Sequence, residues 1–168
     1  MKTEQKKDIY FHGLESGQGG EKVDFLAKKY LTIAPSMDYY NPELFQEMLE
    51  LVQDIEPDVL IGSSMGGYFA LKIGTHLNIP LILLNPALVN RRISFDEPIE
   101  YGQHRPKIWS LLGAQDDLIP FKEIQEELLK FVAIVEVGGH GHRTPNDVFR
   151  NYIRGIIGEL GQMIETIN

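Results

Sequence analysis

The 168-residue sequence contains no cysteine, which excludes disulfides and thiolate-ligated metal sites. This composition fits a cytoplasmic protein, since disulfides are typical of secreted chains. The sequence also has no run of eighteen apolar residues, so we expect no membrane-spanning helix. The first seven residues, Met1 to Lys7, are charged and polar and have no apolar segment directly behind them, so we do not expect a signal peptide.

Basic residues are scarce: 16 lysines and arginines stand against 24 aspartates and glutamates, giving a net charge of −8. This balance disfavours nucleic acid and anionic membranes as partners. The sequence has no Gly-Lys-Ser/Thr segment of a P-loop, and the turn after Ile61 lacks Gly-x-Gly-x-x-Gly. We therefore expect no nucleotide cofactor, and a chain of this length predicts one domain spanning residues 1–168.

Short apolar stretches alternate with amphipathic stretches along the chain, which predicts a parallel sheet covered by helices on both faces. We expect six strands, at residues 8–11, 30–34, 58–61, 80–84, 107–112 and 133–137. Helices are expected at residues 42–55, with Asn41 as cap, after Ser64, at 120–131, and from a capping-box-like start at Thr144. The predicted fold class is thus α/β, a three-layer sandwich around a mainly parallel six-stranded sheet.

The most informative motif is Gly62-Ser63-Ser64-Met65-Gly66, which follows the apolar run Val59-Leu60-Ile61. It has the Gly-x-Ser-x-Gly pattern of a nucleophile elbow, in which a serine stands on a sharp turn between a strand and a helix. Side chains two positions before and after the serine would collide, so glycines are needed there. The pattern predicts Ser64 as a nucleophile.

A serine nucleophile needs a base and a carboxylate that orients the base, and both are expected after later strands. Asp116 and Asp117 follow the fifth predicted strand, and either fits the order Ser…Asp…His. His140 and His142 lie in a glycine-rich loop after the last predicted strand, and the residues alone do not separate them.

An oxyanion hole is expected from two backbone N–H groups. One belongs to Met65, which follows the nucleophile, and the other to Leu14, in the loop after the first strand. We interpret His12 as a residue that braces this loop.

Three segments together resemble the small YqiA/YcfP-type esterases of the α/β-hydrolase superfamily: Phe11-His12-Gly13-Leu14, Gly62-Ser63-Ser64-Met65-Gly66-Gly67-Tyr68 and Asn85-Pro86-Ala87. The resemblance covers residue 9 to about residue 155. It implies a compact serine hydrolase that begins at the third strand of the larger hydrolase fold and acts without a cofactor or metal.

The resemblance also implies site residues. Ser64 is the nucleophile, and Asp116 fits the acid better than Asp117 because Asp116-Asp117-Leu118-Ile119-Pro120 resembles the superfamily's Asp-x-x-(Val/Ile)-Pro. His142, followed by Arg143, is favoured as the base, with His140 as the alternative. Residues of the matching segments are expected at the substrate: His12, Gly13, Tyr68 and Asn85.

The predicted function is hydrolysis of a small ester or thioester through an acyl-enzyme. The short excursion between Asn85 and Pro106, which replaces a large lid, suggests an open site for short acyl groups. Arg91, Arg92 and Arg105 are interpreted as solvated loop residues, and the alternative is that they contact an anionic substrate.

Two other interpretations stay open. One is a metal-dependent hydrolase in which His140 and His142 bind a metal with Asp116 or Asp117. The other is a binding protein that keeps the fold without catalysis.

Overall fold

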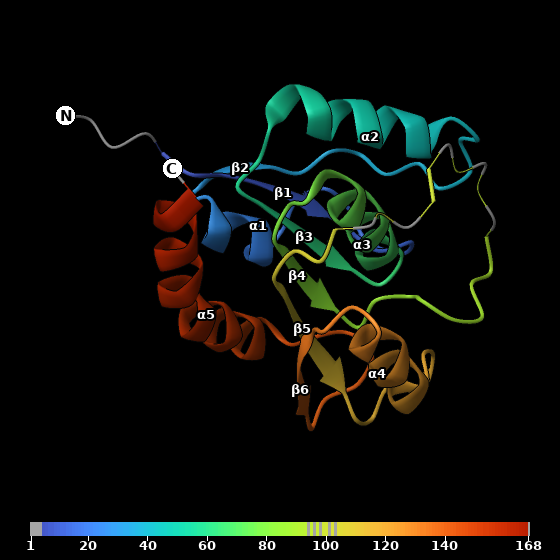
Figure 1. Ribbon diagram of the computed structural model, residues 1–168. Helices are drawn as coiled ribbons and strands as arrows, with labels where there is room; N and C mark the ends of the chain where they lie inside the picture. Colours follow the sequence, from blue (N-terminus) through green and yellow to red (C-terminus); the bar gives the residue numbers. More distant parts are fainter. Residues whose placement is uncertain are drawn as a thin grey trace.

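The computed structural model describes residues 5–93, 95, 97, 99, 100, 102 and 104–167. For residues 163–167 it describes the backbone only. Six parallel strands form one sheet in the order β2-β1-β3-β4-β5-β6 (Figure 1). The strands are β1 (Lys7–Phe11), β2 (Leu31–Ile33), β3 (Val59–Ser63), β4 (Leu81–Leu84), β5 (Ile108–Gly113) and β6 (Ile134–Gly138).

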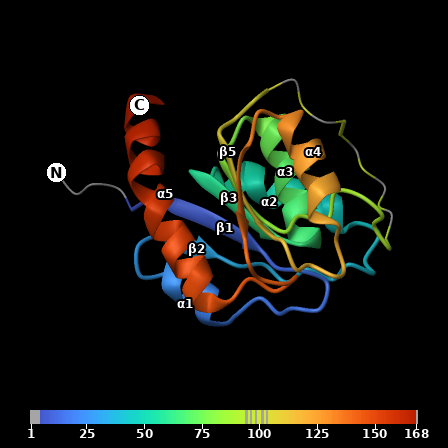
Figure 2. The same ribbon diagram turned by 90° about the horizontal axis from the view of Figure 1, so that it is seen from below.

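Helices cover both faces of the sheet, so the molecule has three layers (Figure 2). The helices are α1 (Glu21–Leu26), α2 (Leu44–Ile55), α3 (Met65–Leu77), α4 (Phe121–Leu129) and α5 (Asn146–Ile167). One apolar cluster lies where α2, α3 and α4 pack on the sheet, and a second lies under α1 and α5. Because the central strands are buried on both sides, their sequences are almost uniformly apolar, as in Leu81–Leu84.

The six strands and their parallel arrangement confirm the predicted fold class, with strand boundaries shifted by one or two residues. One helix was not predicted: α1 has only six residues and follows a glycine-rich segment, so it is too short for a helical repeat to stand out.

Two helix starts also differ from expectation. α2 begins at Leu44 rather than at residue 42, because Asn41 forms a separate turn: its carbonyl accepts the Leu44 N–H at 3.1 Å and its side chain accepts the Glu43 N–H at 3.0 Å. α5 begins at Asn146, and the buried Thr144 hydroxyl has no hydrogen-bond partner among the described residues, so the expected capping box does not form.

The carboxyl ends of the parallel strands meet at one edge of the sheet, where β3 ends at Ser63, β5 at Gly113 and β6 at Gly138. Loops after these strands are therefore brought together, which is the general location of active sites in open α/β sheets. Within the described part of the chain, no helix combines the length and apolar character needed to cross a bilayer. Of the excursion between Asn85 and Pro106, residues 94, 96, 98, 101 and 103 lie outside the description.

Candidate active site

Ser64 stands at the junction of β3 and α3 with φ 55° and ψ −119°, a strained conformation for a residue with a side chain. The flanking glycines make this turn possible. A Cβ on Gly62 would lie 2.3 Å from the Gly66 carbonyl oxygen, and one on Gly66 would lie 2.1 Å from the Phe11 carbonyl oxygen. The strand, the helix and the end of β1 thus approach so closely that only glycine fits at both positions.

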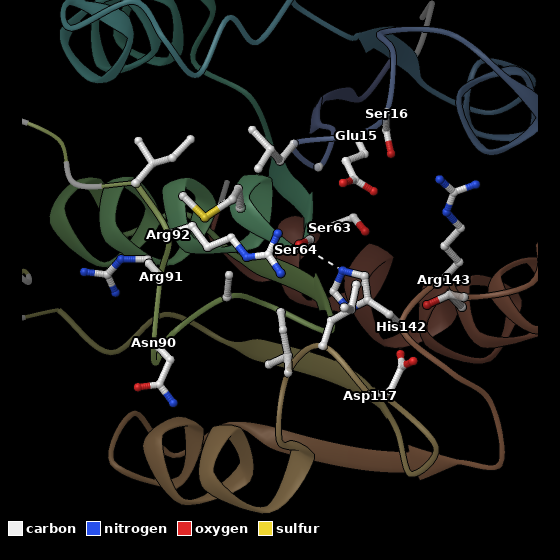
Figure 3. Close-up of a pocket in the computed structure, with 18 of the residues that line it drawn as sticks. Glu15, Ser16, Ser63, Ser64, Asn90, Arg91, Arg92, Asp117, His142 and Arg143 are labelled. Atoms are coloured by element: carbon white, nitrogen blue, oxygen red, sulfur yellow. Dashed lines mark hydrogen bonds between the residues drawn. The ribbon is translucent and has the colours of Figure 1, made fainter.

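Ser64, His142 and Asp116 form a continuous chain of hydrogen bonds, of which Figure 3 shows the one between His142 and Ser64 as a dashed line. His142 Nδ1 lies 2.8 Å from Asp116 Oδ2, and His142 Nε2 lies 3.1 Å from Ser64 Oγ. Because a carboxylate only accepts hydrogen bonds, Nδ1 carries the proton and Nε2 is left free to accept one from the serine. This is the arrangement by which an imidazole removes a proton from a hydroxyl.

Asp116 is fixed by further hydrogen bonds. Its Oδ1 accepts the backbone N–H groups of Leu118 at 2.9 Å and Ile119 at 2.8 Å, and its side chain is only 1% exposed. Asp117, by contrast, is exposed and lines the neighbouring cavity. The structure therefore places Asp116, not Asp117, against the histidine.

The two histidines of the glycine-rich loop have different surroundings. His140 is buried, its ring lies against Gly138, and its Nδ1 is 2.9 Å from the Gly141 carbonyl oxygen, whereas His142 reaches Ser64. In the described residues no group of three or more histidines, aspartates and glutamates is arranged to hold a metal ion. The alternative interpretation, in which His140 and His142 bind a metal, thus lacks a third ligand among these residues.

The loop after β1 packs directly on the serine, since a Cβ on Gly13 would lie 3.2 Å from Ser64 Cβ. His12 braces this loop. Its Nε2 accepts the Met37 N–H at 3.2 Å, so its Nδ1 must be the protonated nitrogen that donates to the Gly13 carbonyl at 2.8 Å. Tyr39 fixes the same loop by donating to the His12 carbonyl at 2.5 Å.

Met65 and Leu14 are the expected donors of the oxyanion hole. Met65 is the first residue of α3, and the first N–H groups of a helix have no partner within the helix. Gly13 and Leu14 line the cavity beside Ser64 together with Met65. The loop after β1 and the start of α3 therefore border the same space.

Three of the residues expected at the substrate need correction, because they are buried against protein groups and do not line the cavity around Ser64. Both ring nitrogens of His12 form hydrogen bonds with backbone groups, as described above. Tyr68 donates its hydroxyl to Glu97. Asn85 donates to the His142 carbonyl at 2.7 Å and accepts the Gly113 N–H at 2.7 Å, so it ties the histidine loop to the end of β5. Gly13 is the one of the four that lines the cavity.

The cavity beside Ser64 has a volume of about 610 Å³. One part of its wall is apolar and comes from the loops after β4 and β5, with the side chains of Ala87, Val89, Ile93, Leu118 and Ile119. Another part is polar and charged. Arg91 and Arg92 line the cavity as well, and the Arg91 guanidinium stands 3.8 Å from the centre of the Tyr68 ring. Arg105 lies over Phe131 instead.

Tyr10 also reaches the cavity, from β1. Burial raises the pKa of its hydroxyl to about 12, although a hydrogen bond with Ser63 acts in the opposite direction. Tyr10 therefore remains protonated at neutral pH and is no base for Ser64.

Sequence reasoning missed two basic residues at the cavity, Lys22 and Arg143. Arg143 directly follows His142 in the sequence, so its place near the cavity could have been predicted from that of His142. Lys22 lies on the unpredicted helix α1, and no sequence pattern points to it.

Solved structures with the same fold include α/β hydrolases. MGS-M1, an alpha/beta hydrolase enzyme from a Medee basin deep-sea metagenome library, has a TM-score of 0.67 at 20% identity, covering 96% of this chain and 85% of that chain. The Pyrococcus furiosus esterase PF2001 has a TM-score of 0.71 at 16% identity, covering 95% of this chain and 82% of that chain. These likenesses show that the chain has the α/β-hydrolase fold.

Sequence comparison adds a family. A UPF0227 protein from Shewanella woodyi is 28% identical over 165 residues, covering 82% of this chain and 90% of that protein. The UPF0227 protein YcfP of Escherichia coli O9:H4 is 28% identical over 166 residues, covering 82% of this chain and 91% of that protein. A model of the family matches residues 7–100, more than half of the sequence. The chain therefore belongs to the family described as "Uncharacterised protein family (UPF0227)".

Proposed function

We propose that this protein is a serine hydrolase that cleaves carboxylic esters or thioesters through Ser64, His142 and Asp116. The observation that carries the proposal is the hydrogen-bond chain from Asp116 through His142 to the strained Ser64. The α/β-hydrolase fold, and the likeness to a protein named as an esterase, support the same chemistry. We expect a short acyl group to bind in the cavity of about 610 Å³ beside Ser64.

In the first step, Ser64 Oγ attacks the carbonyl carbon while its proton passes to His142 Nε2. Asp116 holds the imidazole in the tautomer that accepts this proton and stabilises the imidazolium that forms. The carbonyl oxygen becomes an oxyanion, for which the N–H groups of Met65 and Leu14 are the proposed donors. The bond to the leaving oxygen or sulfur then breaks, and that atom takes the proton from His142.

In the second step, water attacks the acyl-enzyme. His142 Nε2 accepts a proton from the water, the bond between the acyl carbon and Ser64 Oγ breaks, and the serine regains its proton. The products are a carboxylic acid and an alcohol or thiol. The hydrogen bonds of His12 fix the loop after β1, which supports a fixed position for the proposed donor on this loop.

The test is covalent labelling by a fluorophosphonate, which reacts only with an activated serine. We expect one phosphonyl group on the peptide that contains Ser64, and no label after Ser64→Ala. Ser63→Ala is the matched control, because it removes a neighbouring hydroxyl and leaves Ser64 in place, and it should still be labelled. Absence of label from the folded wild-type protein would contradict an activated serine and favour a binding protein.

A further inference from the structure

The charges at the cavity differ from those of the whole chain. The sequence carries a net charge of −8, yet the cavity is lined by four cationic side chains and two carboxylates. The cationic ones are Lys22, Arg91, Arg92 and Arg143, and the carboxylates are Glu15 and Asp117. In the described part of the chain no carboxylate oxygen lies within 4 Å of a nitrogen of Lys22, Arg92 or Arg143. Among the described residues, positive side chains thus outnumber carboxylates at the cavity beside Ser64, where the proposed substrate binds.

Lys22, on α1, and Arg143, in the loop after β6, come from different elements and both line the cavity. Lys22 is partly buried and donates to Asn146 Oδ1 at 3.2 Å. Burial lowers the pKa of Lys22, and the nearby charge of Arg143 acts in the same direction, while Glu21 acts against both. The Glu21 carboxylate itself accepts a hydrogen bond from Asn146 at 2.7 Å and lies 3.5 Å from Arg150.

A second hollow lies beside the main cavity. It has a volume of about 200 Å³ and shares the lining residues Tyr10, Ser16 and Lys22 with the main cavity. Lys22 therefore lies between two hollows at the surface.

The position of His142 decides which half of a substrate lies here. The leaving oxygen or sulfur takes its proton from His142, so the leaving half must lie on the histidine side of the serine. Arg143 is the next residue, and Figure 3 shows it on one side of the Ser64–His142 pair, with Asn90 and Arg91 on the opposite side. The apolar residues Val89 and Ile93 share the loop of Arg91, so they offer a place for the acyl chain.

We propose that the leaving half of the substrate carries an anionic group, a carboxylate or a phosphate, that binds between Lys22 and Arg143. This rests on the proposed hydrolase function and specifies its substrate. Charge-assisted hydrogen bonds from an ammonium and a guanidinium suit either anion, and Arg binds such groups in a bidentate manner.

The test compares two acetate esters that differ in one charge, 4-acetoxybenzoate and its neutral analogue 4-acetoxybenzamide. For the wild type we expect the kcat/KM of the anionic ester to exceed that of the neutral ester about tenfold. Lys22→Gln and Arg143→Gln should each lower this ratio by about fivefold, the size expected of one partly exposed ion pair. Arg105→Gln, which removes an arginine outside the cavity, is the matched control and should leave the ratio unchanged. Salt should also lower the ratio in the wild type.

Several results would overturn the proposal. One such result is Ser64-dependent hydrolysis of both esters with nearly equal kcat/KM. It would leave the hydrolase function intact and rule out the anion site. A loss of preference confined to Arg92→Gln would place the anion at Arg92 instead and overturn the proposal. An Arg143-dependent preference for phenyl hydrogen adipate over phenyl hexanoate would also overturn it, since there the charge lies on the acyl half.

A binding measurement keeps the two proposals separate. If neither ester is cleaved and no phosphonate label appears, the hydrolase function fails, and calorimetry on the Ser64→Ala protein then decides the anion site alone. Tighter binding of 4-acetoxybenzoate than of 4-acetoxybenzamide, lost in the double variant Ser64→Ala/Arg143→Gln, would support it. Equal affinity for both compounds, or no binding of either, would overturn it.

Discussion

Asp116 and Asp117 are neighbours in the chain, yet only Asp116 contacts the histidine, at 2.8 Å. Its other oxygen accepts two backbone N–H groups, so the carboxylate is held in one orientation. Replacing it by asparagine keeps the shape but offers an amide N–H where His142 needs an acceptor. The imidazole would then carry its proton on the wrong nitrogen.

We therefore predict that Asp116→Asn lowers the kcat for a simple ester by about a thousandfold. Asp117→Asn, the matched control, should cost far less, because Asp117 is exposed at the cavity. Steady-state kinetics on both variants measures the difference. Similar losses at the two positions would refute the assignment of the acid to Asp116.

At this scale, the sequence points to Ser64, the proposed nucleophile, more directly than to the residues that it contacts. Ser64 follows from local geometry, because the glycines around it are needed by the turn itself. The choice between His140 and His142 depends on how a glycine-rich loop folds back over the sheet. That loop is held by Asn85, which donates to the His142 carbonyl from a residue 57 positions earlier in the chain. The composition of the loop does not contain this information, and only the family resemblance of His142-Arg143 favours His142. No pattern near Lys22 indicates its position at the cavity.

The elements around the elbow are packed backbone against backbone, which gives a stability prediction. In Gly66→Ala the new methyl would meet the Phe11 carbonyl oxygen at 2.1 Å, and neither α3 nor β1 can move without disturbing the sheet. We expect a loss of about 3 kcal/mol in the free energy of unfolding, at the upper end for overpacking.

Gly158→Ala is the control for this prediction. Gly158 lies on α5, is exposed, and has nothing within 4 Å of its would-be Cβ. Alanine there should raise the free energy of unfolding by about 0.5–1 kcal/mol through helix propensity. Urea denaturation gives both values, and a Gly66→Ala protein as stable as wild type would contradict the close approach of α3 and β1.

Among the elements, buried strands and long amphipathic helices are predictable because their patterns extend over many residues. α1 is not, since six residues give less than two helical turns. The sequence predicts a start of α2 two residues too early, because Asn41 and Pro42 resemble a cap and a first helical residue. In the structure Asn41 forms its hydrogen bonds in the preceding turn.

For the whole molecule, Asp8 links stability to pH. Its side chain is buried on β1, and burial raises the pKa of its carboxyl from 3.8 to about 6, although the Thr32 hydroxyl donates to it. Its second oxygen has no hydrogen-bond partner among the described residues. Between about pH 4 and pH 6 the native state thus keeps a proton that the unfolded chain loses, so stability falls as the pH rises through this range.

Relative to wild type, Asp8→Asn should therefore gain stability with rising pH, by ~3 kcal/mol in total over this range. The comparison of the two proteins at each pH cancels the other titrating groups. Asp24→Asn, on the exposed side of α1, is the control and should show no such trend. A pH-independent difference between Asp8→Asn and wild type would contradict the raised pKa of Asp8.

The central claim is that Ser64 performs acyl transfer, and parallel assays of wild type and Ser64→Ala test it most directly. The substrates are 4-nitrophenyl acetate, butyrate and octanoate, so that the same experiment also measures the acyl length that the cavity accepts. The account predicts turnover by the wild type, with a preference for the shorter chains, and a fall of at least about a thousandfold in Ser64→Ala. Undiminished hydrolysis by the Ser64→Ala protein would contradict it.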